Sequence, residues 1–281
     1  MERKEILVVV KTIPTSSSKY YETVCTAGIT KDGQWIRIYP VKFRLLNDSK
    51  QYRKYDWISV EVDSRNPSDD FRKESYRCNQ ETIQVLDHVK PENNWAERKR
   101  ICIDSQKVYS KFSELEQDSA TDTPNFISLA VFKPSQILRV IVRDKDERDV
   151  QNELDRQERI KNEHSQDMFE GAAYATFMQA RPMDVVFNYE FVDGNQKKHS
   201  LMIEDWEIYE LYRKTLRYGK DGAIKKVIEK YEGFIKNNDL YFFLGTRNSA
   251  HRRNWPNKWE IIGVFYPKKE KISNIQQLQL F

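Results

Sequence analysis

The stretch Glu22-Thr-Val-Cys-Thr-Ala-Gly-Ile-Thr30-Lys-Asp-Gly33-Gln-Trp-Ile-Arg-Ile-Tyr39 holds two β-prone segments on either side of Asp32-Gly33. Asp-Gly between two such segments is a strong hairpin signal, because tight turns need residues that tolerate a positive φ. We therefore expect strands over 22–30 and 34–39. This hairpin places the first half of the chain among β-rich folds.

Further strand signals surround the hairpin. Ile6 to Val10 is a continuous apolar run, which is typical of a strand buried on both faces. Residues 57–62 alternate with period two, and residues 82–86, 129–132 and 137–142 give shorter signals. These patterns predict a β-rich domain over residues 1–143, folded as a curled sheet or small barrel.

The remaining sequence divides into two parts. Residues 144–182 begin with a helical pattern whose apolar stripe is thin, which predicts a charged helical connector that is solvated or links two halves. Residues 183–281 predict an α+β domain, with a hairpin at Asp193-Gly194, two helices, and closing strands over 240–244 and 259–266. The expected fold class is therefore α+β, with two packed halves.

The amino-acid composition excludes few classes of function. The chain has 281 residues, and 47 Lys and Arg oppose 43 Asp and Glu, so a polyanionic partner must be argued from local clusters of charge. The three cysteines form no CxxC pair, and the apolar run near the N-terminus is too short for a signal peptide or a membrane span. We expect a cytoplasmic protein that has no membrane partner.

The richest basic segment is the loop predicted over residues 245–258. It carries Arg247, Arg252 and Arg253, with Trp255 among them. Guanidinium groups pair with phosphate oxygens, and an indole offers a face on which an unpaired base can stack. The alternative is that Trp255 and the neighbouring Trp259 anchor the loop in the core, while the arginines pair with nearby carboxylates.

Two N-terminal segments add cations. Arg44, Arg53 and Lys54 alternate with aromatic residues, and they extend a phosphate-binding strip if they share a face with the 245–258 loop. Thr12 and Lys19 flank a hydroxyl-rich turn that can receive a phosphate, although a flexible polar turn explains the same residues.

The strongest candidates for catalytic residues are His199, Asp205 and Glu207, at a predicted strand-to-helix junction. Asp205 suits the N-cap of the helix. Alternatively, these side chains provide an acid or a base for hydrolysis of a glycosidic or phosphodiester bond. With four histidines and no recognisable metal or dinucleotide motif, we expect no metal site and no cofactor.

The block Cys25 to Pro40, together with His199, Asp205-Trp-Glu207 and the segments 240–245 and 261–267, resembles a group of uncharacterised prokaryotic proteins. Relatives in that group often carry cysteines just before the histidine, and residues 187–198 contain none here, which argues against a zinc site. The resemblance implies no established activity. It favours genome defence, such as phage defence, or nucleic-acid processing.

Together these features predict a protein that binds DNA or RNA, single-stranded or locally opened. An enzymatic version would be a hydrolase that acts on nucleic acid, with a base-excising glycosylase favoured over a metal-dependent nuclease. The alternative is a non-catalytic protein-interaction or assembly module, with the charged helix and the 245–258 loop as its binding surfaces.

Overall fold

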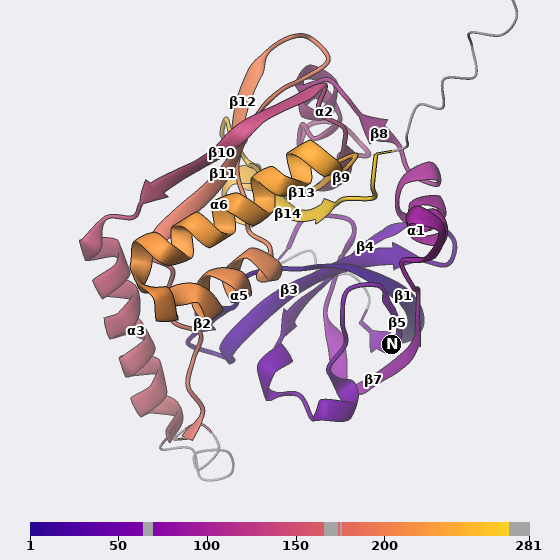
Figure 1. Cartoon of the computed structure of the whole chain (residues 1–281). Coiled ribbons are helices and arrows are strands. Elements are labelled where there is room, and N and C mark those ends of the chain that lie inside the picture. The colour runs from indigo at the N-terminus through magenta and orange to yellow at the C-terminus, as the bar shows by residue number, and fades with distance from the viewer. Residues whose placement is uncertain (64–69, 166–173, 175, 270–281) are drawn as a thin grey trace, which may run out of the picture.

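The fold is seen in a computed structural model that describes residues 1–63, 70–165, 174 and 176–269. The N-terminal part forms a seven-stranded sheet in the order β6-β4-β3-β1-β5-β7, with β2 paired to β3 (Figure 1). Its strands are β1 (Glu2–Lys11), β2 (Thr15–Ser17), β3 (Tyr21–Thr30), β4 (Trp35–Val41), β5 (Asp56–Val62), β6 (Ser75–Tyr76) and β7 (Cys78–His88).

Two glycines explain how the sheet is built. Gly33, in the β3–β4 turn, has a φ of +79°, which side chains rarely adopt. Gly28 lies so close to β1 that a Cβ there would come within 2.3 Å of the Leu7 carbonyl oxygen. The sheet curls around an apolar interior that includes Val8, Ile38 and Val60. The predicted curled sheet is confirmed.

The C-terminal part holds two smaller sheets. One has the order β14-β13-β9-β8 and the other β10-β11-β12. Their strands are β8 (Val108–Tyr109), β9 (Leu129–Phe132), β10 (Gln136–Asp144), β11 (Val185–Val192), β12 (Lys198–Met202), β13 (Tyr241–Thr246) and β14 (Trp259–Phe265). Every strand predicted from the sequence is present, with bounds that differ by a few residues, and the α+β class is confirmed.

The described helices cover these sheets. The α-helices are α1 (Glu92–Lys99), α2 (Phe112–Asp118), α3 (Glu147–Ser165), α5 (Trp206–Thr215), α6 (Gly219–Asn237) and α7 (Asn248–Arg252). Short 3-10 turns lie at η1 (Phe43–Leu45), η2 (Asp48–Lys50) and η4 (Leu216–Tyr218), and a π-helical turn, η3 (Arg100–Asp104), follows α1. Helices α5 and α6 lie together on one side of the C-terminal sheets (Figure 1). In the described part of the chain, no helix is long and apolar enough to cross a membrane.

The two halves share one buried core. Leu7 and Val9 of β1 pack in the same apolar cluster as Phe243 of β13 and Phe265 of β14. A backbone bridge also joins Thr12 of the N-terminal half to Asp205 of the C-terminal half. Strands β8 to β10 pair with C-terminal strands, although the sequence-based division at residue 143 places them in the N-terminal region.

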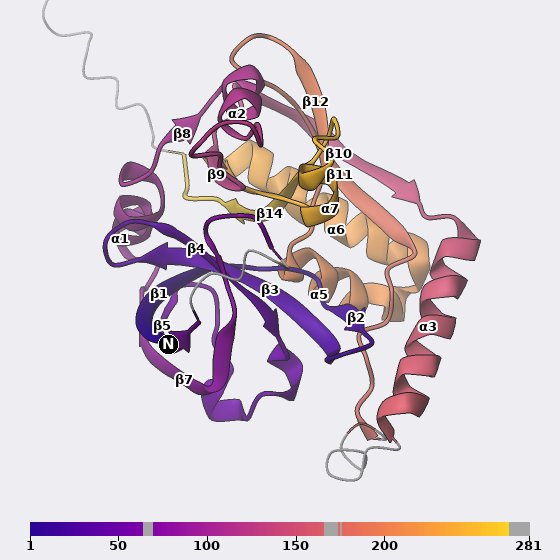
Figure 2. The same cartoon turned by 180° about the vertical axis from the view of Figure 1, so that it is seen from behind.

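Helix α3 is more firmly packed than its thin apolar stripe indicates. Ile160 is buried against Tyr21 and Tyr174. Arg156 Nη2 donates to the Ser16 carbonyl at 3.1 Å, and His164 Nε2 lies 2.7 Å from the Ser18 carbonyl oxygen. The helix therefore runs along the N-terminal sheet at β2 and β3 (Figure 2). Residues 166–173 and 175 of the predicted connector lie outside the described residues.

Candidate nucleic-acid interface

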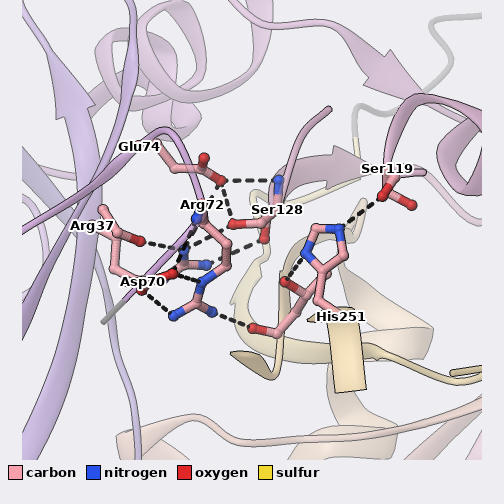
Figure 3. Close-up of polar contacts among 9 residues, drawn as sticks. Arg37, Asp70, Arg72, Glu74, Ser119, Ser128 and His251 are labelled. Carbon is pink, nitrogen blue, oxygen red and sulfur yellow. Dashed lines mark hydrogen bonds and ion pairs between the residues drawn. The ribbon is translucent and has the colours of Figure 1, made fainter. Parts of the chain in front are cut away.

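The loop over residues 245–258, called the Arg-rich loop below, connects β13 to β14 and contains the short helix α7. Its base is anchored by His251, which is fully buried. The His251 ring bonds to Thr246 Oγ1 at 2.9 Å and to the Ser119 carbonyl at 2.7 Å (Figure 3). Trp259 is buried behind the loop, while Trp255 is 49% exposed. Thus one tryptophan serves as the anchor and the other remains available.

The three arginines of the loop have different environments. Arg247 Nε lies 2.8 Å from Glu260 Oε1, so this cation is paired with a carboxylate. Arg252 and Arg253 are exposed, and neither makes an ion pair with any described residue. The Arg252 guanidinium lies over the Phe71 ring at 5.3 Å, and that of Arg253 lies over Trp255 at 4.9 Å. These two arginines retain charge that a phosphate can use.

A buried polar network supports the loop from below. Arg72 binds Asp70 in a bidentate pair at 2.7 and 2.5 Å, and its Nη1 donates to the Thr246 carbonyl at 2.7 Å (Figure 3). Because Thr246 also holds His251, this arginine ties the loop base to the segment that leads into β6.

Arg37 of β4 is the second buried arginine of this network. Its Nη1 donates to Ser128 Oγ at 2.8 Å and to Ser75 Oγ at 3.1 Å. The Glu74 carboxylate accepts from the Ser128 backbone amide at 2.9 Å and also bonds its hydroxyl (Figure 3). Burial and the nearby Arg72 cation lower the pKa of Arg37. We call these contacts the Arg37–Arg72 network.

Neither Arg37 nor Arg72 is among the residues predicted from the sequence. A signal for Arg37 was present, since it stands between Ile36 and Ile38 in a strand that is otherwise apolar. A charge in such a position is buried only when it is paired. Arg72 carries no comparable signal, because it lies in a mostly polar segment outside any predicted strand and its partner Thr246 is distant in sequence.

Beside the Arg37–Arg72 network lies a small cavity of about 160 Å³, called the tyrosine cavity below. Asn248 of the Arg-rich loop belongs to its wall, together with Arg72 and Arg77. Three tyrosines complete the aromatic part of the wall: Tyr20, Tyr39 and Tyr76. Tyr39 is 43% exposed and precedes a cis peptide bond to Pro40. The cavity thus combines ring faces with guanidinium groups next to the exposed loop arginines.

The hydroxyl-rich turn contributes one of its two candidate residues to this area. Lys19 Nζ lies 5.2 Å from the ring centre of Tyr20, which lines the tyrosine cavity. Thr12 lies elsewhere, because its hydroxyl accepts from the Cys25 amide at 3.0 Å and its backbone bridges to Asp205. The turn therefore brings a cation, rather than the Thr12 hydroxyl, toward the loop.

The second basic segment makes contacts of its own. Arg44 binds Glu22 at 2.9 and 3.2 Å. Arg53 is 74% exposed and lies 3.4 Å from Asp56, on β5 near the end of β7. The Arg-rich loop instead contacts Phe71, and its Asn248 lines the tyrosine cavity beside β4 and β6, at the opposite end of the strand order. The two segments therefore do not converge on one site.

Asp205 and Glu207 meet Lys54 rather than His199. Asp205 is fully buried, caps α5 by accepting from the Glu207 amide at 3.0 Å, and accepts from Lys54 Nζ at 2.7 Å. Glu207 Oε2 lies 3.3 Å from the same ammonium. Burial would lower the pKa of Lys54, but the two carboxylates outweigh burial and hold it above its usual range. The capping interpretation of Asp205 describes this geometry.

His199 lies at the other end of β12. Its Nε2 is 3.2 Å from Asp193 Oδ2, and its ring stacks on Phe112 with centroids 4.4 Å apart. Among the described residues, no three His, Cys, Asp or Glu side chains gather as a metal site would require. The three candidate catalytic residues thus occupy two separate places.

Two family models match the chain. One, described as Domain of unknown function (DUF8758), covers residues 2–104, and the other, Domain of unknown function (DUF8757), covers residues 110–281. The gap between the two matches, residues 105–109, follows η3 and contains β8, the first strand that pairs in a C-terminal sheet. No curated protein matches the sequence.

Two solved structures show a distant likeness. "Crystal structure of the tetrameric p202 HIN2" aligns at 7% identity and a TM-score of 0.30, over 96% of this chain and 92% of that chain. "Structure of murine DNA binding protein bound with ds DNA" aligns at 10% identity and a TM-score of 0.29, over 97% and 99%. TM-scores this low carry no argument about function.

Proposed function

The chain belongs to the family described as Domain of unknown function (DUF8757), and from its own side chains we propose that it binds nucleic acid, single-stranded or locally opened. The binding surface would be the loop face, which we define as Tyr39, Arg77, Asn248, Arg252, Arg253 and Trp255. The observation that carries this proposal is that the Arg-rich loop, whose Arg252 and Arg253 make no ion pair with a described residue, also contributes Asn248 to the wall of the tyrosine cavity.

Each part of the loop face has a matching part in a nucleic-acid strand. Exposed guanidinium groups without a carboxylate partner bind phosphate oxygens with little competition. Exposed aromatic rings such as Trp255 and Tyr39 stack bases, for about 1–3 kcal/mol each. A cavity of about 150 Å³ admits benzene, so the tyrosine cavity, at about 160 Å³, has room for one aromatic ring. A base released from pairing fits this combination.

The Arg37–Arg72 network gives the loop face a rigid base. Arg72 and Arg77 line the tyrosine cavity, and Arg72 is fixed by Asp70 and by the Thr246 carbonyl. Sites whose side chains are held in place before binding lose less conformational entropy when the ligand arrives. The buried network would therefore hold the binding residues in place, without itself contacting the phosphate backbone of the nucleic acid.

Binding is better supported than hydrolysis. A hydrolytic version, such as base excision in phage defence, would rest on Asp205, Glu207 and His199. Asp205 is buried and its two oxygens are occupied by Lys54 and the α5 amide, while His199 pairs with Asp193. A general acid or base must reach the proton that it moves. We therefore propose binding as the function and place no reaction at Asp205.

Fluorescence anisotropy with labelled oligonucleotides tests the proposal. The protein should bind single-stranded DNA or RNA more tightly than a matched duplex, and the affinity should fall as salt rises. Replacing both exposed arginines, Arg252→Ala with Arg253→Ala, should reduce the slope of log affinity against log salt by about 2, because each phosphate contact contributes about 1. The melting temperature should stay unchanged.

The matched control is Lys225→Ala with Lys226→Ala, which also removes two exposed positive charges, on α6. This control should leave the salt slope close to that of the parent protein. Equal losses in the two double variants would mean that net charge, and not the loop face, attracts the strand. An absence of oligonucleotide binding at low salt would overturn the proposal and favour the interaction-module alternative.

A further inference from the structure

A larger cavity lies apart from the loop face, beside α3. Its volume is about 420 Å³, which falls within the range of small-molecule sites. The wall comes from the β1–β2 connection, from α3, and from β11 and β12 with the residues next to them (Figure 1). We call it the α3 cavity. One side is apolar: Ile13, Pro14, Met183, Val185, Phe187 and Ile203.

One carboxylate of this wall has no partner. Glu204 is partly buried, and its backbone amide is held by the Ile261 carbonyl at 2.8 Å. No hydrogen bond or ion pair links its carboxylate to another described residue. Burial raises the pKa of Glu204, while Lys145 and Arg247 act in the opposite direction. A partly buried carboxylate without a partner gains free energy when a donor reaches it.

Two cations at the opening of the α3 cavity are also unpaired. The side chains of Lys145 and Arg181 are exposed, and neither makes a hydrogen bond or ion pair with a described residue. Arg156, in contrast, is already occupied by the Ser16 carbonyl and by Glu153. The cavity therefore has an inner acceptor, an apolar wall and two cations without a described partner. Its wall also includes Asp149 and Glu153, and Glu153 pairs with Arg156.

We propose that the α3 cavity binds a guanine mononucleotide. The guanine ring would lie against the apolar wall, and its two neighbouring N–H donors would bond the two oxygens of Glu204. An ionised carboxylate only accepts, so these two donors would favour the ionised form of Glu204 against the effect of burial. The phosphate would lie between Lys145 and Arg181, which carry the charge that an anion needs. This site uses none of the residues of the loop face, so it stands independently of the proposed function.

Isothermal titration of the full chain with guanosine monophosphate tests this site. The parent protein should bind with a dissociation constant below about 1 mM, which corresponds to roughly 4 kcal/mol. Glu204→Gln should weaken binding at least tenfold, because the carboxamide turns one acceptor into a donor that faces the guanine N–H groups. Guanosine without phosphate should bind more weakly than the nucleotide, and Arg181→Ala should reduce that difference, because only Lys145 then remains for the phosphate.

Glu229→Gln, an exposed change on α6, is the control for Glu204→Gln and should leave nucleotide affinity unchanged. The proposal is overturned if the folded parent protein does not bind the nucleotide at about 1 mM. It is also overturned if Glu204→Gln and Glu229→Gln bind equally well. The oligonucleotide test changes Arg252 and Arg253 of the loop face, whereas the nucleotide test changes Glu204 of the α3 cavity. A negative result at one site therefore leaves the test of the other site unaffected.

Discussion

The Lys54–Asp205 pair and the Arg-rich loop are both charged and both flanked by aromatic residues, but the fold treats them in opposite ways. Lys54 retains 7% of its side-chain exposure and holds a carboxylate that has none. Arg252 and Arg253 are exposed and lie only over aromatic rings. The Lys54–Asp205 pair joins the N-terminal sheet to α5, whereas Arg252 and Arg253 make no ion pair with any described residue.

This difference shows that the cations of one basic segment can have different roles, so burial and partners must be considered for each residue. Arg53 and Lys54 are adjacent in sequence, yet their side chains are 74% and 7% exposed. A buried charge interacts with a fixed partner and stabilises the fold, whereas an exposed charge contributes little to stability and remains available for binding. Measurements of stability and of affinity should therefore separate the two regions.

The largest expected effect is on stability, at Lys54. Lys54→Ala leaves the Asp205 carboxylate buried without its cation, so the free energy of unfolding should fall by about 3–5 kcal/mol. Urea denaturation measures this loss. Arg53→Ala, one residue away, is the control and should change the free energy by no more than about 0.5 kcal/mol. A small loss in Lys54→Ala would mean that the pair does not hold the two halves together.

The next effect is on affinity, at the loop face. Tyr39→Ala removes an exposed ring from the tyrosine cavity, so oligonucleotide binding should weaken by about 1–3 kcal/mol with an unchanged salt slope. Anisotropy titration gives both quantities. Tyr218→Ala, at a tyrosine that is 58% exposed on η4, is the matched control. Equal affinities for the two variants would remove stacking at Tyr39 from the proposed function.

The fold could be predicted from sequence because its signals are local. The Asp32-Gly33 turn and the apolar run from Ile6 to Val10 depend only on neighbouring residues, and both elements formed as expected. Helix α3 shows the limit of local patterns. Its thin apolar stripe indicates weak packing, but backbone carbonyls of Ser16 and Ser18, far away in sequence, hold its polar side chains.

The candidate site was less predictable, because it depends on which distant groups meet. The sequence identified Arg252, Arg253 and Trp255, which lie on the exposed loop. It also placed Lys54 among the phosphate-binding residues, whereas the partner of Lys54 is Asp205, 151 positions away. Arg72 and its partner Thr246 are separated by 174 positions. No local pattern specifies contacts of that kind.

The last expected effect is on the pH dependence of stability, at Glu260, which is buried and yet paired with Arg247 of the exposed loop. Burial, together with the neighbouring Glu204, raises the pKa of Glu260 from its usual 4.5 to about 8, although Arg247 opposes the shift. The folded state therefore holds the proton more tightly than the unfolded chain. The resulting stability is fully present below about pH 4.5 and is lost as the pH rises through about 8.

Denaturation by urea at a series of pH values between about 5 and 8 measures this contribution. Relative to Glu260→Gln, the parent protein should lose up to about 1.4 kcal/mol of unfolding free energy for each unit of pH, the limit for a single proton. Glu229→Gln, exposed on α6, should keep the slope of the parent. If Glu260→Gln also keeps the slope of the parent, the Glu260 carboxylate of the parent is ionised over the whole pH range. Arg247 then forms an ion pair with it, as Lys54 does with Asp205. The base of the Arg-rich loop would then be held by an ion pair, like the Lys54–Asp205 region. Of the three loop arginines, only Arg252 and Arg253 would remain available to a partner.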